Sequence, residues 1–272
     1  MMRRLLTLAA LACAAGCTAS PHTAAAEKDR YVAAYERLHP SVVLFTMQIP
    51  SNDPKRKGQW DDAYGSGIVV ESGAWGSRIL TDAHVVEDAR NLVAIVGDGP
   101  KAPAHIVART GPDEDLAIVD VKLPNQRAAT LGSIAHVEPG TPIGVLGYPI
   151  PDAFDDDKLG RTASMYAGRV ASLRKGALEV DVPIVPGESG GPVFDVTTGE
   201  VIGIAESRFD EERAIGFATP IDAATRFLAA HPRVVEARRR GSSVQDSGGS
   251  VGERARWPSQ KGAPAAPTTQ RP

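Results

Sequence analysis

The stretch VPGESGGPVFD, residues 185–195, places Ser189 among glycines. A serine hydroxyl becomes a nucleophile when a base takes its proton and a third group holds that base in place. Gly187 and Ser189 are two residues apart, so a tight turn can aim both backbone amides at one point, where they would stabilise the negative oxygen of a tetrahedral intermediate. The stretch therefore predicts a nucleophile with an oxyanion hole. A glycine-rich turn between two strands is the alternative.

The surroundings of the six histidines single out His84 as the candidate base. His84 follows the apolar run of residues 77–81 and a short turn, which places it at a strand end where a cleft can form. The others lie in an N-terminal segment, before a proline, in a strand-like run, in a surface turn and in the last expected helix: His22, His39, His105, His136 and His231.

Asp115 is the candidate for the group that holds the histidine. It follows a polar turn and directly precedes a strand-like run, so its side chain can be fixed against an imidazole. Asp113 and Glu114 are rivals that sit earlier in the turn. Asp120 lies within the strand, where a charge more often faces solvent.

Two series of short β-prone runs surround these residues, separated by Gly, Pro, Asp and Asn. Short strands at this spacing are typical of barrels and sandwiches rather than of βαβ units. We expect an all-β fold of two six-stranded antiparallel β-barrels, over about residues 40–127 and 128–222, with a short C-terminal helix. These elements would form one domain over residues 30–232.

The sequence GESGG also fits G-x-S-x-G, the nucleophile elbow of α/β-hydrolases. That fold alternates strands with helices and has its histidine after the serine. Here the surroundings are all-β, and the histidine downstream of Ser189, His231, lies in an expected helix. The order His84, Asp115, Ser189 is instead that of the chymotrypsin-like triad.

Several blocks resemble successive segments of trypsin-like serine proteases, above all the disulfide-free bacterial HtrA-type branch: ILTDAHVV, DLAIVDV, GESGGPVFD, VIGIA and AIGFATP. The resemblance covers about residues 38–225 and implies the chymotrypsin-like fold. It implies that His84 is the general base, Asp115 its orienting partner and Ser189 the nucleophile, with the Gly187 and Ser189 amides as oxyanion hole. The sequence departs from that branch in two blocks. TDAH lacks the asparagine usual there, and GESGG replaces the usual GNSGG. The tail that follows is too short for the PDZ domain usual in it.

The same resemblance places the floor of a specificity pocket near Pro183 and one wall at the strand containing Glu206. Glu206 would favour a basic substrate side chain if it points inward, and a solvent-facing Glu206 is the alternative. The acidic loop 151–160 lacks the alternating ligand spacing of a calcium loop. We therefore expect neither a metal nor a cofactor.

Residues 1–17 have a basic start and a short apolar run, as in a secretory signal peptide. The run ends in AAGC, which resembles a bacterial lipobox and predicts lipidation of Cys17. Cys13 is a weaker candidate, and an ordinary signal peptide cut after Ala26 is the alternative. Residues 18–29 would then be a tether. Residues 233–272, rich in Gly, Ser, Pro and Arg, predict a disordered basic tail.

The net charge of −3 gives no indication of nucleic-acid binding. The sequence therefore predicts an exported serine endopeptidase of the bacterial cell envelope. It would act on protein or peptide substrates through an acyl-enzyme and contact the membrane through its lipid anchor. The alternative is a latent or inactive lipoprotein that uses a protease fold for binding or as a scaffold. Sequence leaves the oligomeric state open.

Overall fold

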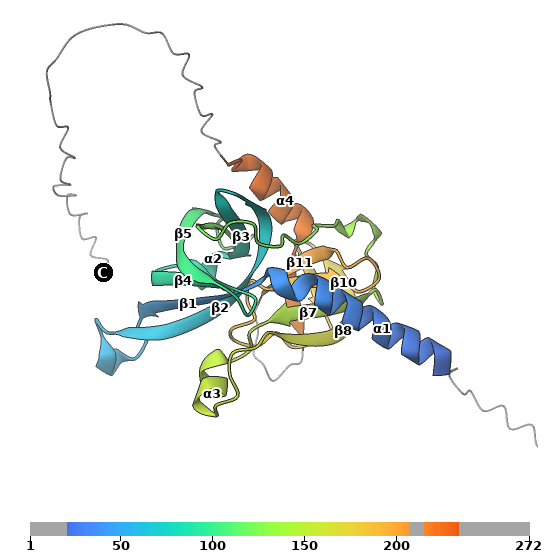
Figure 1. Ribbon diagram of the computed structural model, residues 1–272, viewed down its shortest axis with the longest axis horizontal. Helices are drawn as coiled ribbons and strands as arrows, with labels where there is room; N and C mark the ends of the chain where they lie inside the picture. Colours follow the sequence, from blue (N-terminus) through green and yellow to red (C-terminus); the bar gives the residue numbers. More distant parts are fainter. Residues whose placement is uncertain (1–20, 207–214, 234–272) are drawn as a thin grey trace, which may run out of the picture. The chain divides into compact units, whose positions relative to one another are not determined.

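A computed structural model describes residues 21–206 and 215–233, and its strands form two closed barrels (Figure 1). Each barrel has six strands, with antiparallel pairing throughout. This confirms the all-β prediction of two six-stranded barrels. The signal peptide with Cys17 and almost all of the predicted tail lie outside the described residues.

The first barrel closes in the order β1-β2-β3-β6-β5-β4. Its strands are β1 (Val42–Pro50), β2 (Trp60–Gly73), β3 (Gly76–Asp82), β4 (Arg90–Val96), β5 (Lys101–Arg109) and β6 (Leu116–Val121). The second barrel closes in the order β10-β11-β12-β9-β8-β7. Its strands are β7 (Pro142–Gly147), β8 (Ser164–Arg174), β9 (Ala177–Val180), β10 (Pro192–Asp195), β11 (Val201–Glu206) and β12 (Gly216–Pro220).

Burial along the strands reflects their positions. In β5, exposed residues alternate with half-buried ones, as expected where successive side chains point to opposite faces of a sheet. Strands β3 and β11 are buried at every residue. They belong to different barrels but contact each other, so both of their faces are covered.

Three apolar clusters make up the core. Two fill the interiors of the barrels, and the third joins barrel to barrel. This junction packs Leu80 and Leu116 of the first barrel with Phe194 and Ile204 of the second, and Phe227 of the last helix is part of it. The junction therefore fixes how residues from the two barrels meet.

Few helices accompany the barrels: α1 (Pro21–Leu38), α2 (Ala83–Val86), α3 (Pro151–Asp156) and α4 (Ile221–Ala230), with 3₁₀ turns η1 (His39–Ser41), η2 (Pro54–Arg56) and η3 (Ile134–His136). Helix α4 confirms the expected C-terminal helix. Helix α1 includes residues 21–29, most of the segment expected to be a tether, because the alanines there have high helix propensity. None of the described helices is long and apolar enough to span a membrane.

Candidate active site

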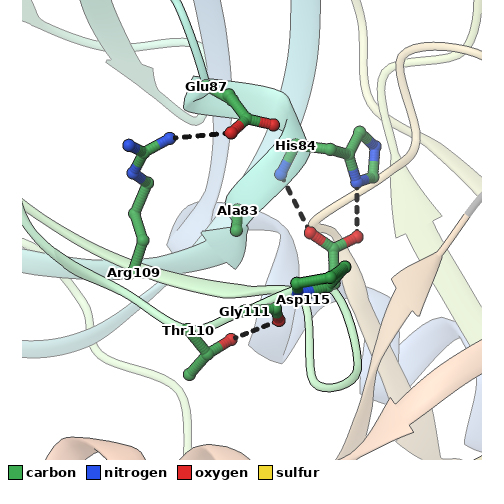
Figure 2. A pocket seen from close by; sticks show the side chains of 8 residues that line it. Ala83, His84, Glu87, Arg109, Thr110, Gly111 and Asp115 are labelled. Atoms are coloured by element: carbon green, nitrogen blue, oxygen red, sulfur yellow. Dashed lines mark hydrogen bonds and ion pairs between the residues drawn. The ribbon is translucent and has the colours of Figure 1, made fainter. Parts of the chain in front are cut away.

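His84 and Asp115 form a hydrogen-bonded pair at one end of the first barrel. His84 lies in α2, directly after β3, and Asp115 directly precedes β6, the strand paired with β3. The carboxylate accepts the His84 backbone N–H at 2.9 Å and meets the ring Nδ1 at 2.6 Å (Figure 2). Because an ionised carboxylate can only accept, Nδ1 carries the proton. The other ring nitrogen, Nε2, is then the basic one.

The backbone around Asp115 is fixed in a left-handed conformation, with φ of 47°. Aspartate tolerates this region better than most residues. Its N–H donates to Gly111 O at 2.9 Å, and its carbonyl accepts from Ala83 N at 3.0 Å. Burial raises the pKa of the Asp115 carboxyl, but the hydrogen bonds and charge of His84 outweigh burial, and the net pKa lies below the ordinary value. The carboxylate is therefore ionised at neutral pH.

Ser189 lies in the turn that leads into β10 of the second barrel and is 5% exposed. Its carbonyl accepts the N–H of Ser66, a residue of β2 in the first barrel, at 2.8 Å. The next residue, Gly190, has φ of 86°, and a Cβ there would lie 2.1 Å from Thr81 Oγ1 and 3.1 Å from Asp82 N. The Ser189 turn therefore packs against the end of β3, immediately before the helix that carries the histidine.

Gly187 has a conformation that a side chain would disturb. Its φ is 94°, and a Cβ would lie 2.2 Å from Tyr148 O. Its carbonyl accepts from Ser66 Oγ at 2.6 Å, while Pro186 O accepts from Ile150 N at 2.8 Å. The C=O and N–H of a trans peptide point in opposite directions, so the Gly187 N–H points away from Ile150. Among the described residues it meets no hydrogen-bond acceptor.

Glu188, which lies between Gly187 and Ser189, is fully buried. Its Oε2 accepts the Val185 N–H at 2.9 Å, and Oε1 has no hydrogen-bond partner in the described part of the chain. Burial raises the pKa of this carboxyl to about 7. The carboxyl is therefore protonated at mildly acidic pH.

A second carboxylate, Asp82, is buried near the imidazole, with Oδ2 4.0 Å from His84 Nδ1. Ligand atoms of Asp82, His84 and Asp115 lie within 4.8 Å of one another, a spacing that a cation could also use. Nδ1 already bonds to Asp115 at 2.6 Å. A protonated Nδ1 has no free lone pair for a metal, so in this arrangement that nitrogen serves the hydrogen bond to Asp115.

A cavity of about 610 Å³ opens beside the pair (Figure 2). At its rim, Arg109 and Glu87 form an exposed ion pair of 3.5 Å. Its other lining residues are Ala83, His84, Thr110, Gly111, Pro112 and Asp115. The cavity has room for a ligand side chain next to His84.

Comparison with known proteins identifies the family. The family model described as "Trypsin-like peptidase domain" matches residues 65–204, a segment that includes His84, Asp115 and Ser189. The chain belongs to the trypsin-like peptidase family. HhoA and HhoB of Synechocystis sp. (strain ATCC 27184 / PCC 6803 / Kazusa), both named as serine proteases, are 33% and 30% identical to it. The alignments cover 65% and 66% of this trypsin-like chain, and 43% and 42% of those proteins.

Solved structures of this trypsin-like family have the same fold. The HtrA-type protease AlgW with tripeptide matches with a TM-score of 0.60 and 26% identity, over 74% of this chain and 62% of that one. The serine endoprotease from Yersinia pestis matches with a TM-score of 0.58 and 25% identity, over 74% and 65%. These neighbours confirm the predicted resemblance to the HtrA-type branch. The chain spans less than half the length of its curated relatives HhoA and HhoB.

The residues predicted for the specificity pocket of the trypsin-like domain occupy different environments. Pro183 is exposed in the segment before the Ser189 turn. Glu206 is 2% exposed, which rules out the solvent-facing orientation. Its carboxyl meets that of Asp115 and the hydroxyl of Thr219. A role for either residue in selecting substrates stays a prediction.

Sequence reasoning missed the residues that join the two halves of the trypsin-like site. Ser66 bonds to the Ser189 turn through its N–H and to Gly187 through its hydroxyl. Thr81 Oγ1 in turn donates to Ser66 O at 2.6 Å. The available signal was the placement of Ser66 between two glycines in the run GSG, but nothing local shows that this run meets residues more than a hundred positions later.

Proposed function

We propose that the chain is an exported serine endopeptidase that hydrolyses peptide bonds of proteins through an acyl-enzyme. The observation that carries the proposal is the His84–Asp115 pair, oriented by two hydrogen bonds, in the trypsin-like domain where the Ser189 turn meets the end of β3. Cleavage of an unfolded protein by the purified chain, and its loss in Ser189→Ala, tests the proposal.

In the proposed reaction, Ser189 Oγ attacks the substrate carbonyl carbon while His84 Nε2 takes its proton. The imidazolium then gives that proton to the leaving amine, and the C–N bond breaks to leave an ester on Ser189. In the second half of the reaction, water attacks the ester carbon while His84 takes its proton. The imidazolium returns that proton to Ser189 Oγ as the C–O bond breaks, and the acid product leaves. Asp115 holds Nδ1–H throughout and stabilises the transient imidazolium without taking the proton itself.

The N–H groups of Gly187 and Ser189 would stabilise the oxyanion. This assignment is supported by the peptide before Gly187, whose carbonyl is held by Ile150 and whose N–H points the other way. A hole arranged before substrate binds stabilises developing charge without reorganisation during the reaction. The Gly187 N–H meets no acceptor among the described residues, so it is available to an oxyanion.

Replacing Gly187 with alanine should lower kcat/KM by about 10²- to 10³-fold, the usual effect of losing one oxyanion donor. The Cβ would lie 2.2 Å from Tyr148 O at a φ of 94°, so the peptide must rotate away. Gly176→Ala is the matched control, because Gly176 also has positive φ, 79°, but has nothing within 4 Å of its Cβ position. Peptide-hydrolysis kinetics should separate the two variants. Equal activities would show that the turn geometry is not required.

The substrates would be proteins or peptides, in keeping with the tripeptide that accompanies AlgW in its solved structure. The cavity beside His84 offers a place for one substrate side chain, with both charges of the Arg109–Glu87 pair at its rim. Preference for a basic residue through Glu206 belongs to the sequence prediction, and burial of Glu206 against Asp115 argues against it.

The site of action would be the bacterial cell envelope, with the chain anchored through a lipid on Cys17. Relatives from Halomonas elongata (strain ATCC 33173 / DSM 2581 / NBRC 15536 / NCIMB 2198 / 1H9) and Pseudomonas putida (strain GB-1), each 30% identical, are named as periplasmic serine endoproteases. The lipobox-like AAGC supports the anchor. Metabolic labelling with palmitate should be lost in Cys17→Ser and kept in Cys13→Ser. Labelling that persists in Cys17→Ser would exclude Cys17 as the site.

A further inference from the structure

A third carboxyl group reaches the His84–Asp115 pair from the other barrel. Glu206 ends strand β11, is 2% exposed, and its side chain is hydrogen-bonded to that of Asp115. The hydroxyl of Thr219, on the paired strand β12, lies 3.5 Å from Glu206 Oε2 and 3.3 Å from Glu114 O. Thr219 therefore bridges the Glu206 side chain and the loop that carries Asp115.

Two carboxyl groups in hydrogen-bond contact away from solvent cannot both be ionised at little cost, so one of them holds a proton. Asp115 accepts two hydrogen bonds from His84, at 2.9 and 2.6 Å, and both favour its charged form. Glu206 lies deeper, in surroundings that disfavour a charge. The proton therefore belongs on Glu206.

We propose that Glu206 is a positioning residue for the proposed peptidase: as a neutral acid, it donates a hydrogen bond to the Asp115 carboxylate and holds it against His84. The inference rests on the proposed function of the site. Asp115 is then fixed from two sides, by His84 of its own barrel and by Glu206 of the other. The carboxylate keeps its charge, and its rotation away from the imidazole is opposed.

The charged and titratable surroundings of Glu206 determine what its ionisation would do. Asp82 lies at the end of β3, Asp115 precedes β6 and His84 lies in α2, while β12 contributes the Phe217 ring and the Thr219 hydroxyl. Residues 207–214 follow Glu206 directly and contain Arg208, Asp210, Glu211, Glu212 and Arg213, all outside the described residues. Loss of the Glu206 proton would place a second negative charge against Asp115 and remove the donated hydrogen bond.

The test compares Glu206→Gln, which keeps a donor, with Glu206→Ala, which removes it, in the full chain. Glu36→Gln, at an exposed position of α1, is the matched control. We expect Glu206→Gln and Glu36→Gln to keep kcat/KM near the wild-type value. Glu206→Ala should lose about 10- to 100-fold, mostly in kcat, as for a lost hydrogen bond to a charged group. At alkaline pH, the kcat/KM of the wild type should fall as Glu206 loses its proton. This fall should be absent in Glu206→Gln, because an amide cannot ionise.

A second readout does not depend on turnover. In the Ser189→Ala background, the far-downfield ¹H NMR signal of His84 Nδ1–H should persist with Glu206→Gln and shift or disappear with Glu206→Ala. Equal damage by both substitutions, or the same pH profile in wild type and Glu206→Gln, would overturn the positioning role. If the wild type does not cleave peptides but the NMR signal responds as expected, the proposed function fails while the inference about Glu206 stands.

Discussion

Replacing His84 with alanine should lower kcat/KM for peptide hydrolysis by about 10⁴- to 10⁶-fold, the range for removing the base of a serine–histidine–aspartate triad. In the proposed mechanism the imidazole takes the Ser189 proton, and the 2.6 Å hydrogen bond from Nδ1 to Asp115 holds the ring in one orientation. Its 44% exposure leaves the ring open to a bound peptide.

His105→Ala is the control for this prediction, because His105 is exposed on β5 of the same barrel, away from Asp115. Steady-state hydrolysis of one peptide by wild type and both variants is the measurement. His105→Ala should match the wild type. A His84→Ala variant that retains more than a few per cent of wild-type kcat/KM would show that another group acts as the base.

Asp115→Asn should lower kcat by about 10⁴-fold without disturbing the fold. In the wild type, Asp115 accepts two hydrogen bonds from His84, one from the backbone N–H and one from Nδ1–H. An asparagine can accept the first through its oxygen but presents an NH₂ group to Nδ1. The imidazole must then carry its proton on Nε2, where it can no longer accept one from Ser189.

Asp113→Asn is the matched control, since Asp113 is exposed in the same loop and was a rival candidate in the sequence. It should leave kcat unchanged. The tautomer change in Asp115→Asn can be followed directly by ¹⁵N NMR of the His84 ring. If Asp113→Asn abolishes activity and Asp115→Asn does not, the carboxylate has been assigned wrongly.

The barrels were predictable because each strand carries its own local signal. The twelve β-prone runs in the sequence correspond to the strands β1–β12, and glycine, proline or acidic turns separate them. The limits of the N-terminal helix were not predictable from the same signal. Residues 21–29 look like a polar tether, yet their alanines extend α1 back to Pro21.

The candidate site was predictable where short sequence motifs indicate the chemistry of a residue. His84 follows an apolar strand and Asp115 precedes one, so each position can be read locally, and the structure joins the two by hydrogen bonds. The contacts between barrels could not be read this way. Ser66 meets Gly187 across 121 positions, and Glu206 meets Asp115 only through the packing of β11 against the first barrel. Such pairings depend on barrel closure and not on neighbouring residues.

The central claim is that Ser189 is a nucleophile activated by His84, and reaction with an active-site serine phosphonate tests it most directly. The full-length chain should form one covalent adduct, mapped by mass spectrometry to Ser189. Ser189→Ala should not react, and His84→Ala should react far more slowly. Wild-type protein that stays unmodified would favour a latent or inactive scaffold with a protease fold. Labelling of Ser189→Ala to the same extent as the wild type would contradict the account outright.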